Sequence, residues 1–98
     1  MLMNDDEAKE LMMAVVVQAM KDYQNALYQY NIQRKPEKKQ QAKNIVLECE
    51  AFFRDNISAY SSLDGKRIMQ AVQTKVGKRL EEIGRVMEVP VNDDRKTV

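Results

Sequence analysis

The 98-residue sequence predicts a small all-α protein that folds as a three-helix bundle. Apolar residues recur at steps of three and four in three separate stretches, which is the spacing of one face of a helix. Hydrophobic residues make up 44% of the chain and charged residues 32%, a balance typical of a folded globular domain. Three glycines and two prolines are too few to build the tight turns of an all-β fold.

The first predicted helix begins after Asn4, whose side chain can cap it, and ends near Ile32, ahead of Pro36. One apolar stripe on this helix is expected to face the core: Met13, Val16, Met20, Tyr23, Leu27 and Tyr30. A second, flanking stripe consists of Ala8, Met12, Val15 and Ala19. The run from Leu11 to Val17 is therefore apolar around more than half of the helix. Two short neighbouring helices cannot cover all of it, so we expect it to meet something else as well.

Pro36 suits the first turn of a second helix, because its missing N–H would have had no partner there. The stripe of this helix consists of Ala42, Ile45, Val46, Cys49, Phe52, Phe53 and Ile57. Helix formers become scarce near residues 55–62, so we expect the second helix to be bent or broken there. Asp64 can cap a third helix, whose stripe consists of Ile68, Met69, Val72, Val76, Leu80, Ile83 and Met87.

These elements predict a single helical domain over residues 1–88 and a C-terminal tail over residues 89–98 that is mobile or pairs with a partner. Helices are expected to cover most of residues 5–88. The predicted common core consists of Val16, Met20, Tyr23, Ile45, Cys49, Phe52, Val72, Val76 and Leu80.

The composition contains few of the residues that catalysis or metal binding usually requires. The chain has no histidine, which removes the commonest general base and the commonest neutral metal ligand. One cysteine without histidine cannot make a structural zinc site, and Cys49 lies on an apolar stripe where an inert packed thiol is expected. Gly65-Lys66-Arg67 lacks the upstream glycine of a phosphate-binding loop. We therefore predict a protein that is not an enzyme and uses no cofactor and no metal.

Charge and hydropathy bear on where the protein works. The formal net charge of +1 gives no strong overall field toward nucleic acid or an anionic membrane. The longest apolar run has seven residues, far fewer than the roughly 20 that a membrane-spanning helix needs. The first residues do not resemble a secretory signal, and a lone cysteine cannot form an internal disulfide. We expect a cytoplasmic protein that does not associate with membranes.

Two basic clusters could still make the potential positive locally. The first surrounds the connector between the first two helices and consists of Arg34, Lys35, Lys38, Lys39 and Lys43. The second runs along the third helix and consists of Lys66, Arg67, Lys75, Lys78 and Arg79. These residues are candidate nucleic-acid or phosphate contacts. The alternative interpretation is that they are ordinary solvated lysines and arginines, since no nucleic-acid-reading motif accompanies them.

Aromatic and methionine side chains suggest contacts with another protein. Tyr28 lies off the core stripe of the first helix, where an amphipathic ring can anchor an interface. Seven methionines add flexible side chains that suit adaptable contact surfaces as well as core gaps. We predict that the chain self-associates as a twofold homodimer or a higher oligomer through Met12, Val15 and Ala19.

Three segments of the sequence form a recognisable pattern: Asp22-Tyr23 with Ala26-Leu27, the block Glu48-Cys49-Glu50-Ala51-Phe52-Phe53-Arg54, and Leu63-Asp64-Gly65-Lys66-Arg67-Ile68. In these segments the chain resembles short proteins encoded by phages, prophages and integrative elements of Firmicutes. In that family an acidic-Cys-acidic-x-Phe-Phe-Arg block precedes an Asp-Gly pair and an isoleucine. The resemblance covers roughly Asp22 to Ile68. It implies a mobile genetic element as the setting of the protein and implies no particular activity.

Small non-enzymatic proteins of mobile elements commonly bind a host factor or a component of host defence, and a helical bundle offers a rigid face for that purpose. Our first hypothesis is therefore a phage or mobile-element accessory protein that binds a host protein in the host cytoplasm. The second is a nucleic-acid-binding accessory protein that uses the two basic clusters. A third is an oligomeric sponge for a nucleotide signal, in which basic and tyrosine side chains of neighbouring subunits enclose phosphates and bases.

Overall fold

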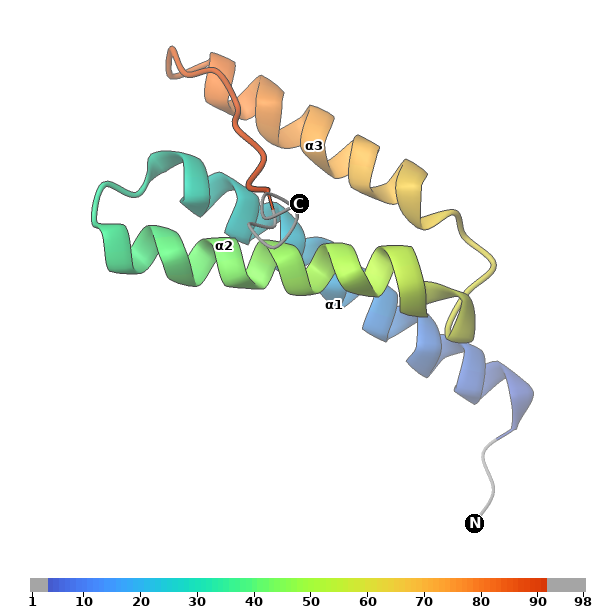
Figure 1. Cartoon of the computed structure of the whole chain (residues 1–98). Coiled ribbons are helices and arrows are strands. Elements are labelled where there is room, and N and C mark those ends of the chain that lie inside the picture. Colours follow the sequence, from blue (N-terminus) through green and yellow to red (C-terminus); the bar gives the residue numbers. More distant parts are fainter. Residues whose placement is uncertain (1–3, 92–98) are drawn as a thin grey trace, which may run out of the picture.

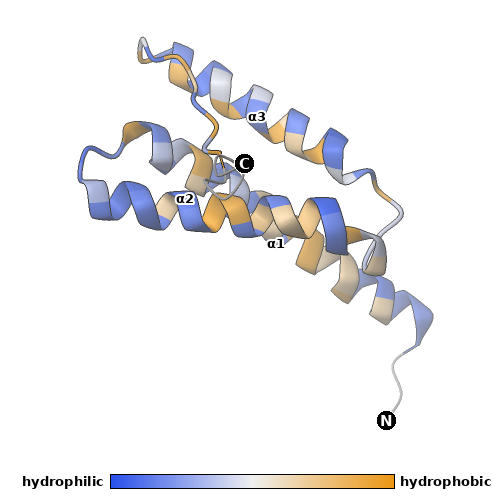
Figure 2. Ribbon diagram, in the orientation of Figure 1, coloured by the Kyte–Doolittle hydropathy of each residue, from blue (hydrophilic) through white to orange (hydrophobic). Residues whose placement is uncertain are grey.

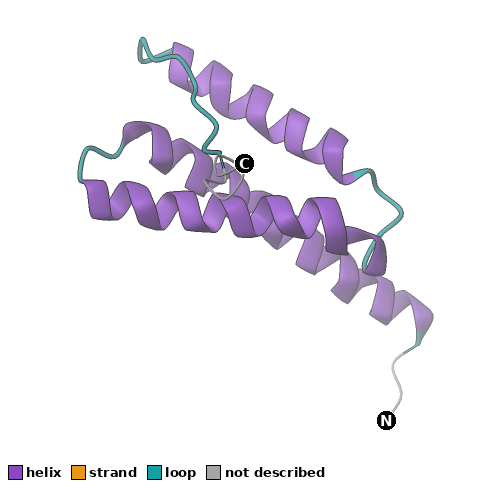
Figure 3. Cartoon of the chain, in the orientation of Figure 1, coloured by secondary structure: helices purple, strands orange, loops and turns teal. Residues whose placement is uncertain are grey.

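A computed structural model describes residues 4–91 of the chain, and this part contains three α-helices and no strand (Figures 1 and 3). They are α1 (Asp5–Ile32), α2 (Pro36–Ala51) and α3 (Gly65–Glu81). α1 packs against both other helices, while α3 meets the chain that follows α2. The predicted all-α three-helix fold is confirmed.

The predicted starts of the helices are confirmed, because each depends on contacts between neighbouring residues. Asn4 Oδ1 accepts a hydrogen bond of 2.8 Å from the backbone N–H of Glu7 and caps α1. Pro36 occupies the first turn of α2. Asp64 Oδ1 accepts a hydrogen bond of 3.0 Å from the N–H of Lys66 and caps α3. α1 ends at Ile32, as the sequence predicted.

The second helix was predicted to be bent or broken near residues 55–62, and regular α-helical hydrogen bonding ends close to that point. α2 continues into a π-helical turn, η1 (Phe52–Asn56), and then into a short 3₁₀ turn, η2 (Ile57–Ala59). The N–H groups of Tyr60 and Ser61 both donate to the carbonyl of Ile57, which closes this end. Wider and tighter turns in succession replace the regular helix where its helix formers run out.

The core contains five of the nine predicted residues: Val16, Tyr23, Val72, Val76 and Leu80. Met20, Cys49 and Phe52 are only partly buried against it, and Ile45 is 44% exposed, so the prediction was wrong for these four. Val46 and Phe53, one residue further along in each case, are buried in place of Ile45 and Phe52. Both pairs lie on one broad stripe, and the packing of α2 against α1 selects which member faces inward.

Helices cover most of residues 5–88, as predicted, but α3 ends at Glu81 and leaves out Ile83 and Met87 of its predicted stripe. Gly84 adopts a φ of 76°, the left-handed conformation that glycine reaches without steric cost. The N–H of Arg85 bonds to the carbonyl of Leu80 at 2.9 Å, and the N–H of Gly84 bonds to the carbonyl of Glu81 at 3.0 Å. This pair of bonds is a Schellman motif, which terminates a helix at such a glycine. Ile83 is therefore exposed and does not extend the stripe.

The segment after Gly84 turns back over the bundle and is held by Asn31, the one buried polar residue in the described part of the chain (Figure 1). Asn31 Nδ2 donates to the carbonyl of Glu88 at 2.9 Å, and the N–H of Glu88 donates to Asn31 Oδ1 at 2.7 Å. Arg85 adds a hydrogen bond of 2.9 Å to the Asn31 carbonyl. Met87 packs against the core and Pro90 is buried.

The tail was predicted to begin at residue 89 and to be mobile or partner-bound. Pro90, the second residue of this predicted tail, is buried, and the Asn31 hydrogen bonds hold the backbone at Glu88 immediately before it. Residues 92–98, the rest of the predicted tail, lie outside the described residues.

α1 has 28 residues, whereas α2 has 16 and α3 has 17, so α1 extends past its neighbours at its N-terminal end (Figure 1). Residues 5–15 form this extension, which we name the α1 arm; no residue of it is buried, and Val16 is the first buried residue of the helix. Figure 2 shows apolar residues continuing into the arm.

Candidate functional site

The α1 arm concentrates large apolar side chains that the protein leaves exposed. Leu11 is 56% exposed, Val15 is 43% exposed, and Met12 and Met13 are similar. Scattered exposed apolar residues are common on soluble proteins, but a contiguous group on one rigid helix marks a contact surface. The arm is therefore the first candidate site.

One flank of the arm continues the side of α1 that packs on α2. Ala26 lies in the groove between α1 and α2, and the stripe Ala8, Met12, Val15 and Ala19 follows the same face toward the N-terminus. Ala19 is partly buried against the core, whereas Met12 and Val15 are exposed. The structure thus places two of the predicted contact residues on an uncovered surface and the third at its base. We name these four residues the α2-side stripe.

The opposite flank of the arm leads into a groove between α1 and α3 with a volume of about 280 Å³. α1 contributes Val17, Met20 and Gln24 to its walls, and α3 contributes Ala71 and Val72. Lys21 from α1 and Lys75 from α3 also line it, and both are exposed. Within residues 4–91 neither ammonium group has an ion pair with a carboxylate. The groove is therefore apolar at its floor and positive at its rim.

The second basic cluster does not form a single row on α3. All five of its residues are exposed, and no acidic residue occurs in α3 before Glu81. Lys75 lines the groove toward α1, whereas the Arg79 guanidinium lies 3.9 Å from the centre of the Tyr28 ring. Lys78 lines a different groove, together with Glu81. The structure distributes these cations over several sides of the helix.

The first basic cluster lies at the connection between α1 and α2. Lys39 Nζ is 4.5 Å from the centre of the Tyr30 ring, a cation–π contact across the connection. Tyr28, the tyrosine predicted as an interface anchor, is partly buried against the core, and the Arg79 guanidinium lies over its ring. Both rings therefore stabilise the bundle from its rim.

A partly buried polar cluster links the three helices at Tyr23. Its hydroxyl donates to Glu50 Oε2 of α2 at 2.8 Å and accepts from Gln73 Nε2 of α3 at 2.8 Å. Burial raises the pKa of Tyr23 far above its ordinary value, and the Glu50 carboxylate adds to this rise. Each of the three side chains has a hydrogen-bond partner within the cluster, so the cluster fixes the relative positions of the helices.

Cys49 is a poor nucleophile in this environment. Burial raises the pKa of its thiol to about 11, and the carboxylates of Asp22, Glu48 and Glu50 contribute in the same direction. The thiolate is the reactive form of cysteine, so the thiol is largely unreactive near neutral pH.

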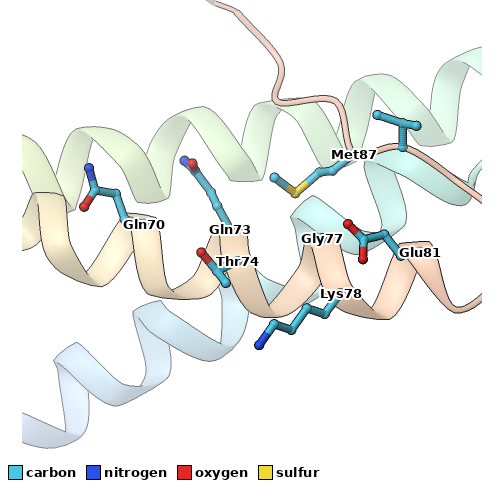
Figure 4. A pocket seen from close by; sticks show the side chains of 8 residues that line it. Gln70, Gln73, Thr74, Gly77, Lys78, Glu81 and Met87 are labelled. Carbon is cyan, nitrogen blue, oxygen red and sulfur yellow. The ribbon is translucent and has the colours of Figure 1, made fainter.

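A second groove of about 570 Å³ lies along α3 and the returning C-terminal segment (Figure 4). Gln70, Gln73, Thr74 and Gly77 line it from α3, and Met87 lines it from the segment. In Figure 4 Lys78 points away from Gln73 and Met87. Gln73 Nε2 already donates to the Tyr23 hydroxyl, so part of the polar lining of this groove serves the bundle itself.

Over residues 4–91 no group of three or more cysteine, aspartate or glutamate side chains is arranged to hold a metal ion. No helix within the same residues has the length and apolar character needed to cross a membrane. The chain matches no protein-family model, no curated protein and no solved structure in our comparisons.

The sequence predictions missed the groove between α1 and α3, and they missed Asn31. The groove follows a stripe that the sequence does carry, since Asp6, Glu10, Met13, Val17 and Lys21 occur at steps of four, three, four and four. Asn31 gave no comparable signal, because its partners lie 54 and 57 residues away.

Proposed function

We propose that the protein is a non-enzymatic accessory protein of a phage or mobile element that acts by binding a host protein in the host cytoplasm. The observation that carries this proposal is the α1 arm, a rigid helical extension with exposed apolar side chains. The resemblance to mobile-element proteins supports the genetic setting. A component of host defence is the class of partner that fits this setting best.

The α2-side stripe is the proposed binding surface for the host protein. Its residues recur at steps of four, three and four, which is how an amphipathic helix presents anchors to an apolar groove. The helix is already formed and capped by Asn4, so binding does not have to pay for ordering it. We expect the partner to carry a shallow apolar groove that receives Met12 and Val15.

The absence of catalysis is part of the proposal. The thiol of Cys49 is held in its protonated form, and the Tyr23 cluster satisfies its own polar groups. These are the two places where partly buried, potentially reactive side chains lie. Their arrangement suits a structural role better than a catalytic one.

The test compares capture of host proteins by tagged wild-type protein with capture by Met12→Glu and Val15→Glu. Each variant places a charge in the apolar interface, so recovery of the partner should fall at least about tenfold. Gln41→Glu introduces the same charge at an exposed position of α2 and should leave recovery unchanged. Far-UV circular dichroism should show the same helix content in all four proteins.

The proposal predicts at least one host protein that the wild type and Gln41→Glu both capture and that both stripe variants fail to capture. If no host protein shows this pattern, the proposal is wrong. It would also be wrong if the stripe variants unfolded the chain, since the stripe would then belong to the core.

Nucleic-acid binding is the second candidate function, favoured by the run of α3 that carries five cations and no acidic residue before Glu81. Replacing Lys66, Arg67, Lys75, Lys78 and Arg79 by glutamine should then abolish binding to DNA or RNA. Binding of the wild type should fall steeply as salt rises, because phosphate contacts release counterions. No mobility shift of any nucleic acid at low salt would exclude this function.

A further inference from the structure

We propose that two copies of the chain pair through the α3-side flank of the arm, each arm seating in the groove between α1 and α3 of the other copy. This flank consists of Asp6, Glu10, Met13 and Val17, which lead into Lys21 and Lys75 at the rim of the groove. The proposal does not depend on the host partner, which we place on the opposite flank. It also moves the dimer contact away from the residues that the sequence suggested.

The charges on this flank are ordered along the helix. Asp6 and Glu10 lie toward the free end of the arm, Met13 and Val17 form an apolar centre, and Lys21 and Lys75 lie at the base. Met13 and Val17 are exposed, and all four charged side chains are exposed as well. A surface that is negative at one end, apolar in the middle and positive at the other end is complementary to its own reversed copy.

An antiparallel arrangement brings the complementary parts together. In this arrangement Met13 packs on the partner subunit's Val17. Glu10 then lies within about one residue, measured along the helix axis, of the partner subunit's Lys21. The twofold symmetry repeats both contacts. A parallel arrangement would instead set like charges against each other, so the charge order selects the antiparallel one.

The shape of the molecule leaves this flank accessible. α1 continues past the start of α3, so the arm is uncovered beside the groove into which its own flank leads (Figure 1). An occupant that carries carboxylates at one end and presents small or flexible apolar side chains would complement this apolar and basic groove. The arm itself has both features.

The test uses charge reversal in Glu10→Lys and Lys21→Glu, with masses measured by light scattering. The wild type should have close to twice the 11.4 kDa chain mass, whereas each variant alone should be monomeric at the same concentration. We expect each reversal to raise the dimer dissociation constant roughly tenfold or more, because two attractive contacts become repulsive. An equal mixture of the two variants should form a dimer, since every reversed contact then pairs opposite charges.

Glu48→Lys and Lys38→Glu make the same charge changes at exposed positions of α2 and should dimerise as the wild type does, alone or mixed. Circular dichroism should show that all variants keep their helices. A monomeric wild type at several hundred micromolar would overturn the proposal. So would single variants that dimerise normally or a mixture that stays monomeric. Loss of host-protein capture in Val15→Glu with an intact dimer would separate the two surfaces.

Discussion

The two halves of α1 have similar apolar spacing and opposite fates. In residues 16–32 Val16, Tyr23 and Leu27 are fully buried, whereas in the arm no residue is buried. The difference comes from the neighbours, because α2 and α3 are too short to reach the arm. The spacing of apolar residues thus predicts which face of a helix is apolar. The lengths of the other helices determine which part of that face is buried within the monomer.

Phe53→Ala should give the largest loss of stability, because this ring is 1% exposed and packs against Tyr23 of the buried half of α1, with 5.8 Å between ring centroids and the rings tilted by 60°. We expect a decrease of about 3–5 kcal/mol in the free energy of unfolding, measured by denaturant titration. Phe52→Ala, which removes a partly buried ring, should cost less than half as much. Equal losses in the two variants would contradict the assignment of Phe53 to the core.

Leu27→Ala and Leu11→Ala compare the two halves of α1 directly. Leu27 is fully buried, so its truncation should cost about 2–5 kcal/mol. Leu11 lies in the arm, and its truncation should change stability by less than about 0.5 kcal/mol in a monomeric sample. A large loss for Leu11→Ala at low protein concentration would mean that the arm is covered within one chain.

Gly65→Ala tests the contact that closes the bundle below the buried half of α1. A Cβ at Gly65 would lie 1.8 Å from the Phe53 carbonyl oxygen, so α3 would have to move away. We expect a loss of about 1–3 kcal/mol. Gly77→Ala is the matched control: a Cβ there meets nothing within 4 Å, and the substitution should stabilise α3 by up to about 1 kcal/mol.

Asn31→Ala removes the side chain that holds the C-terminal segment. Its partners at Leu27 and Glu88 would lose their hydrogen bonds, which should cost about 1–3 kcal/mol. Amide hydrogen exchange at Glu88 should speed up, while exchange in α2 changes little. Unchanged exchange at Glu88 would show that the segment is held without Asn31.

Cys49 should give the smallest effect on stability, seen only in alkaline solution. Because the folded-state pKa is raised from 9.0 to about 11, this group contributes stability that is complete below pH 9 and lost as the pH rises toward 11. The free energy of unfolding should therefore fall more steeply over this interval in the wild type than in Cys49→Ala. Alkylation of the native thiol at pH 8 should be roughly one to two orders of magnitude slower than that of a free thiol. A rate equal to that of free cysteine would contradict the raised pKa.

The all-α class and the places where the helices begin can both be predicted from residues that are close together in the chain. The cap at Asn4, the proline at the start of α2 and the cap at Asp64 each act over three residues or fewer, so local chemistry is enough to predict them. The end of α3 at Glu81 is also local, because the bonds around Gly84 that close it span at most five residues and the glycine is visible in the sequence.

Three features depend on packing between parts of the chain that are far apart in the sequence. They are the choice of inward-facing residues on a broad apolar stripe, the position of the C-terminal segment, and the length of α1 that stays uncovered. The choice of Phe53 over Phe52 depends on how α2 and its π-helical turn pack on α1 and α3. The position of the C-terminal segment depends on Asn31 and Glu88, which are 57 residues apart. The arm is exposed because α2 ends, and α3 begins, before either helix reaches it (Figure 1). Spacing along one helix carries no information about such contacts, since they depend on the lengths and positions of the other elements.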